Sequence, residues 1–336
     1  MPVSFAHLPP ALRPHRLRIV YVDVGADLRS VHTSDHALLT GASAAIGSFD
    51  GVHIGHQHVI ESAIRQARLN GAPSAVIGFD PHPQSFFRPD GPPFRLMALS
   101  QQMRAFEALG VEIAYILHFD AQMAALEAEP FARRILRDHL RLSHVSAGFD
   151  FQFGRKGGGH AHDLEAFGAR LGFTTDILPC QTDADGRKLS SSAVREALQA
   201  GDVTTATAIL GRPQAFLGEV KHGAKLGRTL GFPTLNVALG DYLRPRYGIY
   251  VTRTRLSDGR VFNGVSNIGL RPTVGGDREL LEAYLFGFDE EIYGQMVETE
   301  LLAFIRPEAK FDGLEALKTA IRGDEAAARA WFAKAG

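Results

Sequence analysis

The string GSFDGVHIGHQH, residues 47–58, combines glycines, an aspartate and three histidines directly after the apolar run ASAAI. Its glycines permit tight turns and a close approach of the backbone to a ligand. His53 and His56 are three residues apart, so both can donate hydrogen bonds to one anion. A helix beginning here would add free N–H groups and a positive dipole end, which favour a phosphate. The pattern favours a phosphate site; the alternative is a plain strand–turn–helix connection with Asp50 as the helix cap.

Three other strings of the first half carry polar groups at the expected ends of strands or the beginning of a helix. They are GFDPHPQSFF (78–87), AGFDFQFGRKG (147–157) and KLSSSAVREAL (188–198). In the last, the hydroxyls of Ser190–Ser192 and the Arg195 guanidinium suit a phosphate, and the serines also suit helix capping. The DPHP sequence is equally compatible with a rigid turn.

The second half offers a different chemistry in GRTLGFPTLN (227–236) and ELLEAYLFGFDEEIYG (279–294). Thr234 and Asn236 present a hydroxyl and an amide oxygen, and Mg²⁺ prefers a few such oxygens together with substrate phosphates and water. Glu282 lies inside an otherwise apolar strand. Such a carboxylate is either an outward-facing surface residue or a positioned base, and taken alone the surface reading is favoured.

The elements that must position these residues alternate between strands and helices over the first two thirds of the chain. The expected strands are mostly apolar, which is typical of strands buried on both faces. This order predicts a doubly wound parallel sheet. The expected strands are 42–49, 74–79, 111–119, 144–151 and 173–179, and the expected helices are 56–71, 99–110 with Ser100 as its N-cap, 130–140 and 163–172. The run RLRIVYVDV (16–24) is a possible extra strand.

After residue 211 the sequence becomes rich in Gly and Pro, with short alternating runs. This predicts a small antiparallel barrel or sandwich, closed by a helix within 311–335. We therefore predict a first domain over 1–200 with an N-terminal extension over 1–42, a linker over 201–212, and a second domain over 213–336.

Composition limits the possible partners. The chain has 336 residues, 45% hydrophobic and 22% charged, with a net charge of −1, so electrostatics gives no reason to expect nucleic acid or an anionic membrane. The single cysteine, Cys180, excludes an internal disulfide and a cysteine metal cluster. No signal peptide or membrane-spanning run is recognisable. We expect a cytoplasmic protein; an oligomer is possible but not required.

The string HIGH is the literal form of the HxGH signature of nucleotidylyltransferases. Together with the other strings, in order over roughly 43–330, it resembles the bacterial bifunctional riboflavin kinase/FMN adenylyltransferase (FAD synthetase) family. The resemblance implies an α/β Rossmann-like nucleotidylyltransferase domain followed by a six-stranded antiparallel β-barrel riboflavin kinase domain with a C-terminal helix. It implies ATP, riboflavin and FMN as substrates, FAD as product and Mg²⁺ as cofactor.

The resemblance also assigns roles to residues. In the adenylyltransferase it implies His53 and His56 as catalytic residues, an ATP site of Gly47, Phe49, Asp50, Gly55, Ser191, Ser192 and Arg195, and a flavin site of Asp80, Phe149, Asp150, Phe151 and Phe153. In the kinase it implies Glu282 as the base, Mg-ATP on Gly227, Gly231, Thr234 and Asn236 with the metal on the last two, and flavin near Asn267, Arg271 and Arg306.

Two other hypotheses remain. The chain could be an adenylyl- or cytidylyltransferase for another phosphate-bearing substrate, with the barrel as a binding module, although GFPTLN and Glu282 argue against this. It could also be a flavin carrier without turnover, against which the histidines and Glu282 argue. The sequence departs from the family in having Ser48, Asp80 and Tyr284 where many members have Asn, Glu and His, and in the loop 155–162.

Overall fold

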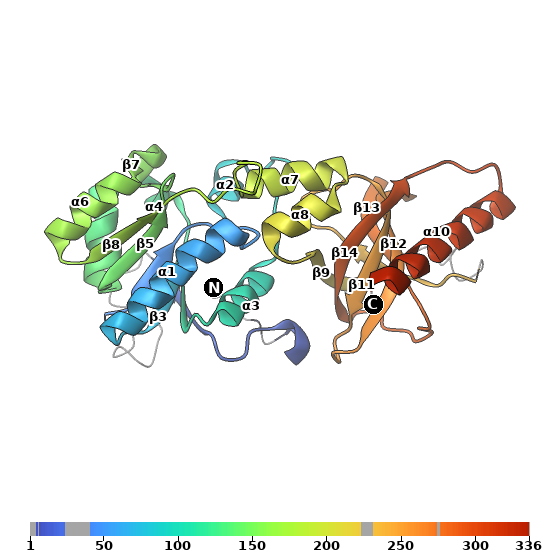
Figure 1. Cartoon of the computed structure of the whole chain (residues 1–336), viewed down its shortest axis with the longest axis horizontal. Helices are drawn as coiled ribbons and strands as arrows, with labels where there is room; N and C mark the ends of the chain where they lie inside the picture. The colour runs from blue at the N-terminus through green and yellow to red at the C-terminus, as the bar shows by residue number, and fades with distance from the viewer. Residues whose placement is uncertain (1–4, 6, 24–40, 223–230, 274–275, 336) are drawn as a thin grey trace. The chain divides into compact units, whose positions relative to one another are not determined.

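A computed structural model describes the chain except for residues 1–4, 6, 24–40, 223–230, 274–275 and 336, and except for the side chains of 271–278. The described residues form two compact units. The first contains Pro14–Gly91 and Gln102–Leu189, and the second contains Phe5–Arg13, Pro92–Gln101 and the chain from Ser190 onward (Figure 1). No described helix is both long and apolar enough to cross a membrane.

The first unit is built on a six-stranded sheet in which every pairing is parallel. Its strand order is β1-β4-β3-β2-β5-β8. The strands are β1 (Arg18–Val22), β2 (Ser43–Ile46), β3 (Ser74–Asp80), β4 (Ile113–His118), β5 (His144–Gly148) and β8 (Thr174–Leu178). The five expected strands are present, and β1 confirms the possible extra strand. All of β2 is buried, in agreement with its apolar sequence.

Helices connect these strands. They are α1 (Ile54–Asn70), α2 (Pro83–Phe87), α3 (Leu99–Leu109), α4 (Ala121–Ala125), α5 (Ala128–Phe131) and α6 (Ala161–Leu171), with a π-helix, η3 (Ala132–His139), a 3-10 turn, η4 (Arg155–Gly157), and a hairpin of β6 (Gln152–Phe153) and β7 (Gly159–His160). Ser100 is the second residue of α3, so its predicted N-cap position is wrong. The helix expected over 130–140 is instead the end of α5 followed by η3.

The second unit centres on a closed barrel with the order β10-β13-β12-β11-β14-β9. Its strands are β9 (Gln214–Lys221), β10 (Thr234–Ala238), β11 (Gly248–Arg255), β12 (Val261–Thr273), β13 (Gly276–Leu285) and β14 (Met296–Pro307). Its helices are η1 (Pro10–Leu12), α7 (Ser191–Ala200), α8 (Val203–Leu210) and α10 (Leu314–Ala335). Residues 201–212, expected to be a linker, contain α8, which packs against α7.

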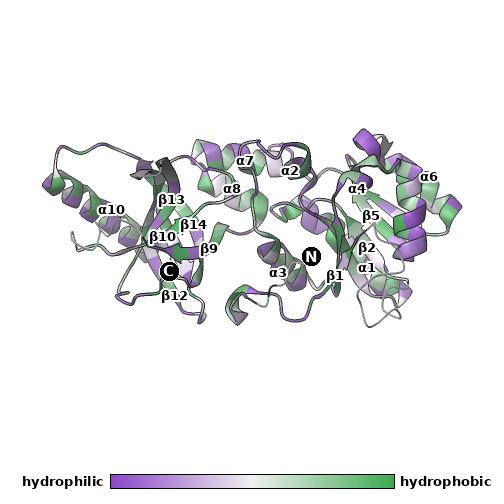
Figure 2. Ribbon diagram, turned by 180° about the vertical axis from the view of Figure 1, so that it is seen from behind, coloured by the Kyte–Doolittle hydropathy of each residue, from purple (hydrophilic) through white to green (hydrophobic). Residues whose placement is uncertain are grey.

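Alternate barrel residues face two different environments, as the pleat of a strand requires. On β13, Leu281, Ala283 and Leu285 are buried in the barrel interior. Tyr284 instead joins an apolar layer outside the barrel, together with Trp331 and Phe332 of α10. Figure 2 shows α10 with both hydrophilic and hydrophobic segments, as expected of a helix that covers a sheet with one side.

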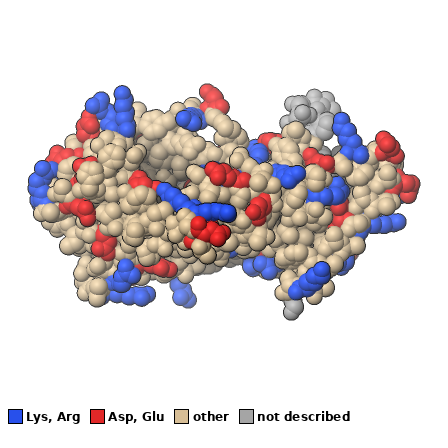
Figure 3. Space-filling model, turned by 45° about the horizontal axis from the view of Figure 1, so that its top comes forward, with Lys and Arg blue, Asp and Glu red and all other residues tan. Residues whose placement is uncertain are grey.

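The surface shows no large region of one charge on the face drawn in Figure 3, where Lys and Arg are interspersed with Asp and Glu. This arrangement agrees with the net charge of −1.

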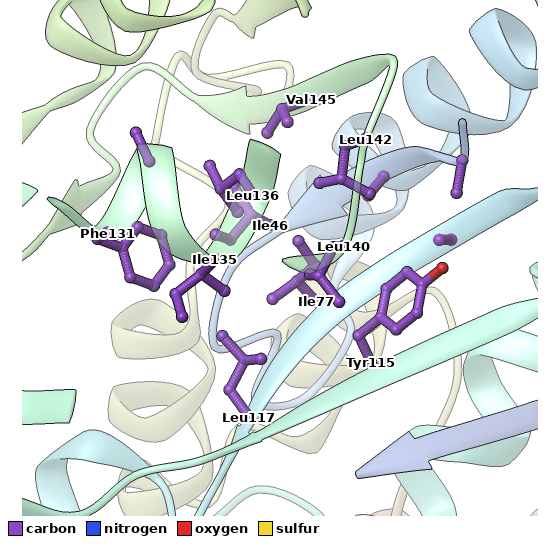
Figure 4. Packing of buried hydrophobic residues seen from close by; sticks show 14 of the residues in the cluster. Ile46, Ile77, Tyr115, Leu117, Phe131, Ile135, Leu136, Leu140, Leu142 and Val145 are labelled. Atoms are coloured by element: carbon purple, nitrogen blue, oxygen red, sulfur yellow. The ribbon is translucent and has the colours of Figure 1, made fainter. Parts of the chain in front are cut away.

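The core of the first unit fixes the strand that leads into the HIGH string. Ile46 at the end of β2 packs with Ile77 of β3 and with Ile135 and Leu136 of the π-helix (Figure 4). Each of these side chains is at most 1% exposed. Burying a side chain of this size stabilises the fold by about 1.5–3 kcal/mol. The end of β2, from which the loop begins, is therefore fixed by core packing.

Candidate active sites

The loop between β2 and α1 has an unusual backbone. Phe49, Gly51 and Val52 have φ angles of 50°, 86° and 40°. Glycine adopts such angles freely, but a β-branched residue such as Val52 does so at a cost on the order of 1–3 kcal/mol. The side chains of Phe49, Asp50 and Val52 are all at most 2% exposed, so packing holds the strained loop in place. Strain of this kind is characteristic of functional loops.

The two histidines of the HIGH string lie side by side at the beginning of α1. Their rings stack with centroids 3.6 Å apart, and the Phe49 ring meets His56 edge-on at 5.3 Å. His53 is the N-cap, because its Nδ1 accepts a hydrogen bond from the His56 N–H at 3.3 Å. Asp50 is therefore not the cap. Gly55 leaves room for this pair, since a Cβ there would lie 3.0 Å from the His53 ring.

The expected flavin residues of the first unit lie at the ends of β3 and β5, the two strands on either side of β2. Asp80 ends β3 and is joined to Pro81 by a cis peptide bond. Phe149 is 49% exposed, and the Lys188 ammonium lies 5.1 Å from the centre of its ring. The same ammonium forms an ion pair with Asp150 at 2.5 Å. The structure thus brings Phe149, Asp150 and Lys188 together.

The remaining aromatic residues of this region divide into two groups. Phe151 and Phe153 stack with centroids 5.5 Å apart, and Phe153 is 6% exposed, so it is part of the core. Beyond Asp80, the rings of Phe86 and Phe87 meet Phe119 edge-on at 5.4 and 5.7 Å.

Ser191, Ser192 and Arg195 lie at the beginning of α7, in the second compact unit. Ser190 caps this helix by accepting a hydrogen bond from the Ala193 N–H at 3.2 Å, which confirms the capping expectation. Arg195 donates from Nε to the Phe94 carbonyl at 3.0 Å, and its guanidinium lies over the Phe94 ring.

The barrel places the expected kinase residues in one row across three strands. Asn236 on β10 is directly opposite Glu282 on β13, and Glu282 is directly opposite Asn267 on β12. Residues opposite one another in antiparallel strands project to the same side of the sheet. Leu281 and Ala283 point into the barrel, so this row lies on its outer side. Thr234 is two residues before Asn236 and shares its side.

Side-chain contacts link this row. Asn267 donates from Nδ2 to the Glu282 carboxylate at 3.5 Å, and from the same atom to Glu308 at 3.3 Å. Asn236 is 7% exposed, and Glu282 and Asn267 are half-buried. A half-buried carboxylate beside two amides differs from the freely solvated surface residue that the strand sequence alone favours.

The other expected kinase residues are placed less directly. Gly231, with φ of 87°, lies in the turn before β10, and Gly227 is outside the described residues. Arg271 belongs to β12, but its side chain is outside the described part of the chain. Arg306 forms a two-point ion pair with Asp324 of α10, at 2.7 and 2.6 Å. The structure therefore shows Arg306 holding α10 against the barrel.

Known protein families match both the first and the second part of the chain. The sequence model of the FAD synthetase family matches residues 35–193, and that of the riboflavin kinase family matches residues 210–332. A bifunctional riboflavin kinase/FMN adenylyltransferase of Haemophilus influenzae is 39% identical over 305 residues, which cover 91% of this chain and 98% of that protein. The chain belongs to the bifunctional riboflavin kinase/FMN adenylyltransferase family. The family, the fold class and the two predicted enzyme activities are thereby confirmed.

Other members and one solved structure extend this likeness. The family member of Pseudomonas fluorescens is 42% identical, covering 86% of this chain and 93% of its own length. A crystal structure from Streptococcus pneumoniae, titled a macrolide-efflux protein, has a TM-score of 0.79 at 29% identity and covers 92% of this chain and 98% of its own.

Sequence patterns did not predict three contacts at or near the expected site residues. They are Lys188 beside Asp150, Phe119 beside Phe86 and Phe87, and Glu308 beside Asn267. Lys188 and the two adjacent phenylalanines were inside strings already singled out. Glu308 follows Pro307 at the end of β14, 26 residues after Glu282, and no local pattern in the sequence relates the two.

Proposed function

We propose that the barrel of this family member transfers the γ-phosphate of ATP to the 5′-hydroxyl of riboflavin, with Glu282 as the general base. Glu282 accepts the hydroxyl proton, an O–P bond forms at the γ-phosphate, and ADP leaves. The observation that carries this proposal is the register that sets Asn236, Glu282 and Asn267 side by side. Catalysis rests mainly on positioning and charge neutralisation, as is usual for phosphoryl transfer.

We propose Thr234 and Asn236 as the residues that would hold Mg²⁺ together with ATP. Their hydroxyl and amide oxygens are hard neutral ligands on one side of β10, a donor set that fits Mg²⁺ when phosphates and water complete its coordination. When bound, the ion would neutralise phosphate charge. We propose that Gly227 and Gly231, which precede this strand in the sequence, also bind Mg-ATP, and that Asn267, Arg271 and Arg306 lie near the flavin.

We propose that the first unit transfers the AMP part of ATP to FMN at the loop before α1. An oxygen of the FMN phosphate attacks the α-phosphate of ATP, and pyrophosphate leaves. The attacking group is already an anion, so the site needs hydrogen-bond donors more than a base. The stacked His53 and His56 at the beginning of α1 are such donors.

We propose that FMN is bound in the first unit near Asp80 and the Phe149–Phe153 segment, with Gly47, Phe49, Asp50 and Gly55 shaping the ATP side. The exposed Phe149 ring offers an apolar surface that suits stacking of the flavin ring system. We also propose that the protein acts in the cytoplasm, where its small-molecule substrates are found and where a chain with a single cysteine needs no disulfide. We propose no nucleic acid and no membrane as a partner.

Incubation of the purified chain with riboflavin, ATP and Mg²⁺, followed by chromatographic separation of flavins, tests these proposals. We expect FMN and then FAD to accumulate, and both to disappear when Mg²⁺ is removed with EDTA. Full activity in EDTA would exclude the metal role of Thr234 and Asn236. Binding of riboflavin without any phosphorylated product would contradict the enzymatic assignment.

A further inference from the structure

Glu308 enters the kinase site from outside the strand row. It directly follows β14, yet its carboxylate reaches the Asn267 side chain on β12, where Oε1 accepts from Nδ2 at 3.3 Å. The same Nδ2 donates to Glu282 at 3.5 Å. Two carboxylates therefore share one amide group, and one of them is the proposed base.

Gly269 provides the space that the Glu308 carboxylate fills. A Cβ at this position would lie 2.0 Å from Oε1 and 2.4 Å from the carboxylate carbon of Glu308. Heavy atoms do not approach so closely. Gly269 is two residues after Asn267, so both face the same side of β12. The Glu308 carboxylate thus occupies the space above Gly269, next to the Asn267 amide that it contacts.

The two carboxylates fix the direction of the Asn267 amide. An ionised carboxylate only accepts hydrogen bonds, so it must face the NH₂ group of the amide rather than its oxygen. Turning the amide over would place Oδ1 against two negative groups. In the observed orientation Oδ1 is buried and accepts no hydrogen bond from the described residues.

We propose that Glu308 is a positioning residue of the riboflavin kinase site, which holds the Asn267 amide so that this amide orients the carboxylate of Glu282. The inference rests on the proposed role of Glu282 as the base. Glu308 acts through Asn267 and takes no proton itself. Glu308 contributes to the orientation of the Glu282 carboxylate in the transition state. Loss of Glu308 therefore lowers kcat more than it raises KM.

Replacement of Glu308 in the full-length enzyme gives the first readout. Glu308→Ala removes the acceptor, and we expect kcat for FMN formation to fall about tenfold, the order that one hydrogen bond to a charged group is worth, with KM for riboflavin nearly unchanged. Glu308→Gln keeps an acceptor oxygen at the same place, so its kcat should stay within about threefold of the wild type. Formation of FAD from added FMN should be unaffected in both.

Gly269→Ala gives a second and independent readout. The added methyl group displaces Glu308, so this variant should reproduce the kcat loss of Glu308→Ala. In the double variant the methyl group has no carboxylate to displace, and the two losses should not multiply. Glu315→Ala is the matched control, because this α10 carboxylate is 85% exposed and should leave both activities unchanged.

The outcomes separate this inference from the proposed function. A wild-type chain that makes no FMN would contradict the kinase function itself. Normal kinase activity of Glu282→Gln would contradict the assignment of Glu282 as the general base. If the wild type is active, Glu282→Gln is not, and Glu308→Ala behaves like Glu315→Ala, the positioning role of Glu308 alone is overturned. A rise in KM at constant kcat would likewise overturn it, since that pattern indicates ground-state binding.

Discussion

Glu282 occupies the middle of the polar row on the outer side of the barrel. In the sequence it is one carboxylate in an apolar strand, and a surface position is the simpler reading. In the barrel it lies between Asn236 and Asn267, and Asn267 donates a hydrogen bond to it. The half-buried carboxylate thus has an amide side chain opposite it on each neighbouring strand, and one of the two donates a hydrogen bond to it.

Glu282→Gln keeps the size and the hydrogen-bonding shape of the side chain but cannot take a proton. We expect kcat for riboflavin phosphorylation to fall by about 10²–10⁴-fold, the usual worth of general base catalysis, with little change in riboflavin and ATP binding. Steady-state kinetics with riboflavin measures this. The matched control is Glu300→Gln, which removes a barrel carboxylate paired with Arg253. An equal effect of the two variants would exclude Glu282 as the base.

At the scale of elements, a polar network around the buried His144 joins α1 to strands β5 and β8. His144 is 1% exposed and contacts the hydroxyls of Thr174 at 2.9 Å and Ser146 at 3.0 Å. Asp176 lies 3.8 Å from the same ring and accepts a hydrogen bond from Ser62 of α1 at 2.7 Å. Burial lowers the pKa of His144, and the nearby Asp176 opposes this only in part.

This network predicts acid sensitivity of the first unit. The pKa of His144 is lower in the folded chain than in the unfolded chain, so below the unfolded pKa of about 6.5 the unfolded state binds the proton first. Stability is therefore full above that pH and decreases as the pH falls toward the folded pKa. Urea unfolding at pH 7.5 and 5.5 measures this. Between the two pH values the free energy of unfolding should decrease less for His144→Asn than for the wild type.

His162→Asn is the control for this experiment, because its ring is 76% exposed. It should lose as much stability between the two pH values as the wild type does. An equal pH dependence in His144→Asn and His162→Asn would mean that His144 does not contribute to acid sensitivity.

The barrel unit depends on a segment that lies far from it in sequence. Gln101 accepts from the Tyr242 hydroxyl at 2.5 Å and donates to Glu298 at 2.7 Å and to the Ala215 carbonyl at 3.2 Å. Tyr242 is 7% exposed, and burial raises its pKa. The side-chain amide of Gln101 thus satisfies several buried polar groups at once.

Gln101→Ala should lower the stability of the barrel unit by about 1–3 kcal/mol, because it leaves the Tyr242 hydroxyl and the Glu298 carboxylate without this partner. Thermal inactivation of riboflavin phosphorylation in the full-length chain measures the loss. Gln199→Ala, at an exposed position near the end of α7, should have no comparable effect. Identical inactivation curves for the two variants would contradict a structural role for Gln101.

Local sequence patterns predicted the elements that bury an apolar face, such as β2 and α1, and the HIGH and GFPTLN strings indicated where to look for the two candidate sites. They could not predict contacts between distant residues. The register that pairs Glu282 with Asn267 depends on barrel closure, and Glu308 and Gln101 reach their partners only through tertiary structure. With Ser100 as the N-cap the helix would begin at Gln101, whereas it begins two residues earlier, at Leu99.

At the scale of the whole chain, each compact unit has a core and a set of candidate catalytic residues of its own. Ile46 and its neighbours fix the loop that leads to His53 and to His56 on α1, while the barrel interior fixes the strand that carries Glu282. The product of the kinase reaction, FMN, is the substrate of the adenylyl transfer. The central claim is therefore that two separable sites on one chain perform consecutive steps.

Flavin chromatography of His56→Ala and Glu282→Gln, each given riboflavin in one assay and FMN in another, tests this claim most directly. We expect His56→Ala to convert riboflavin to FMN normally and to make FAD about 10²–10³-fold more slowly, as for the loss of one transition-state donor. Glu282→Gln should make little FMN but convert added FMN to FAD at the wild-type rate. If either folded variant lost both activities, two separable sites would be contradicted.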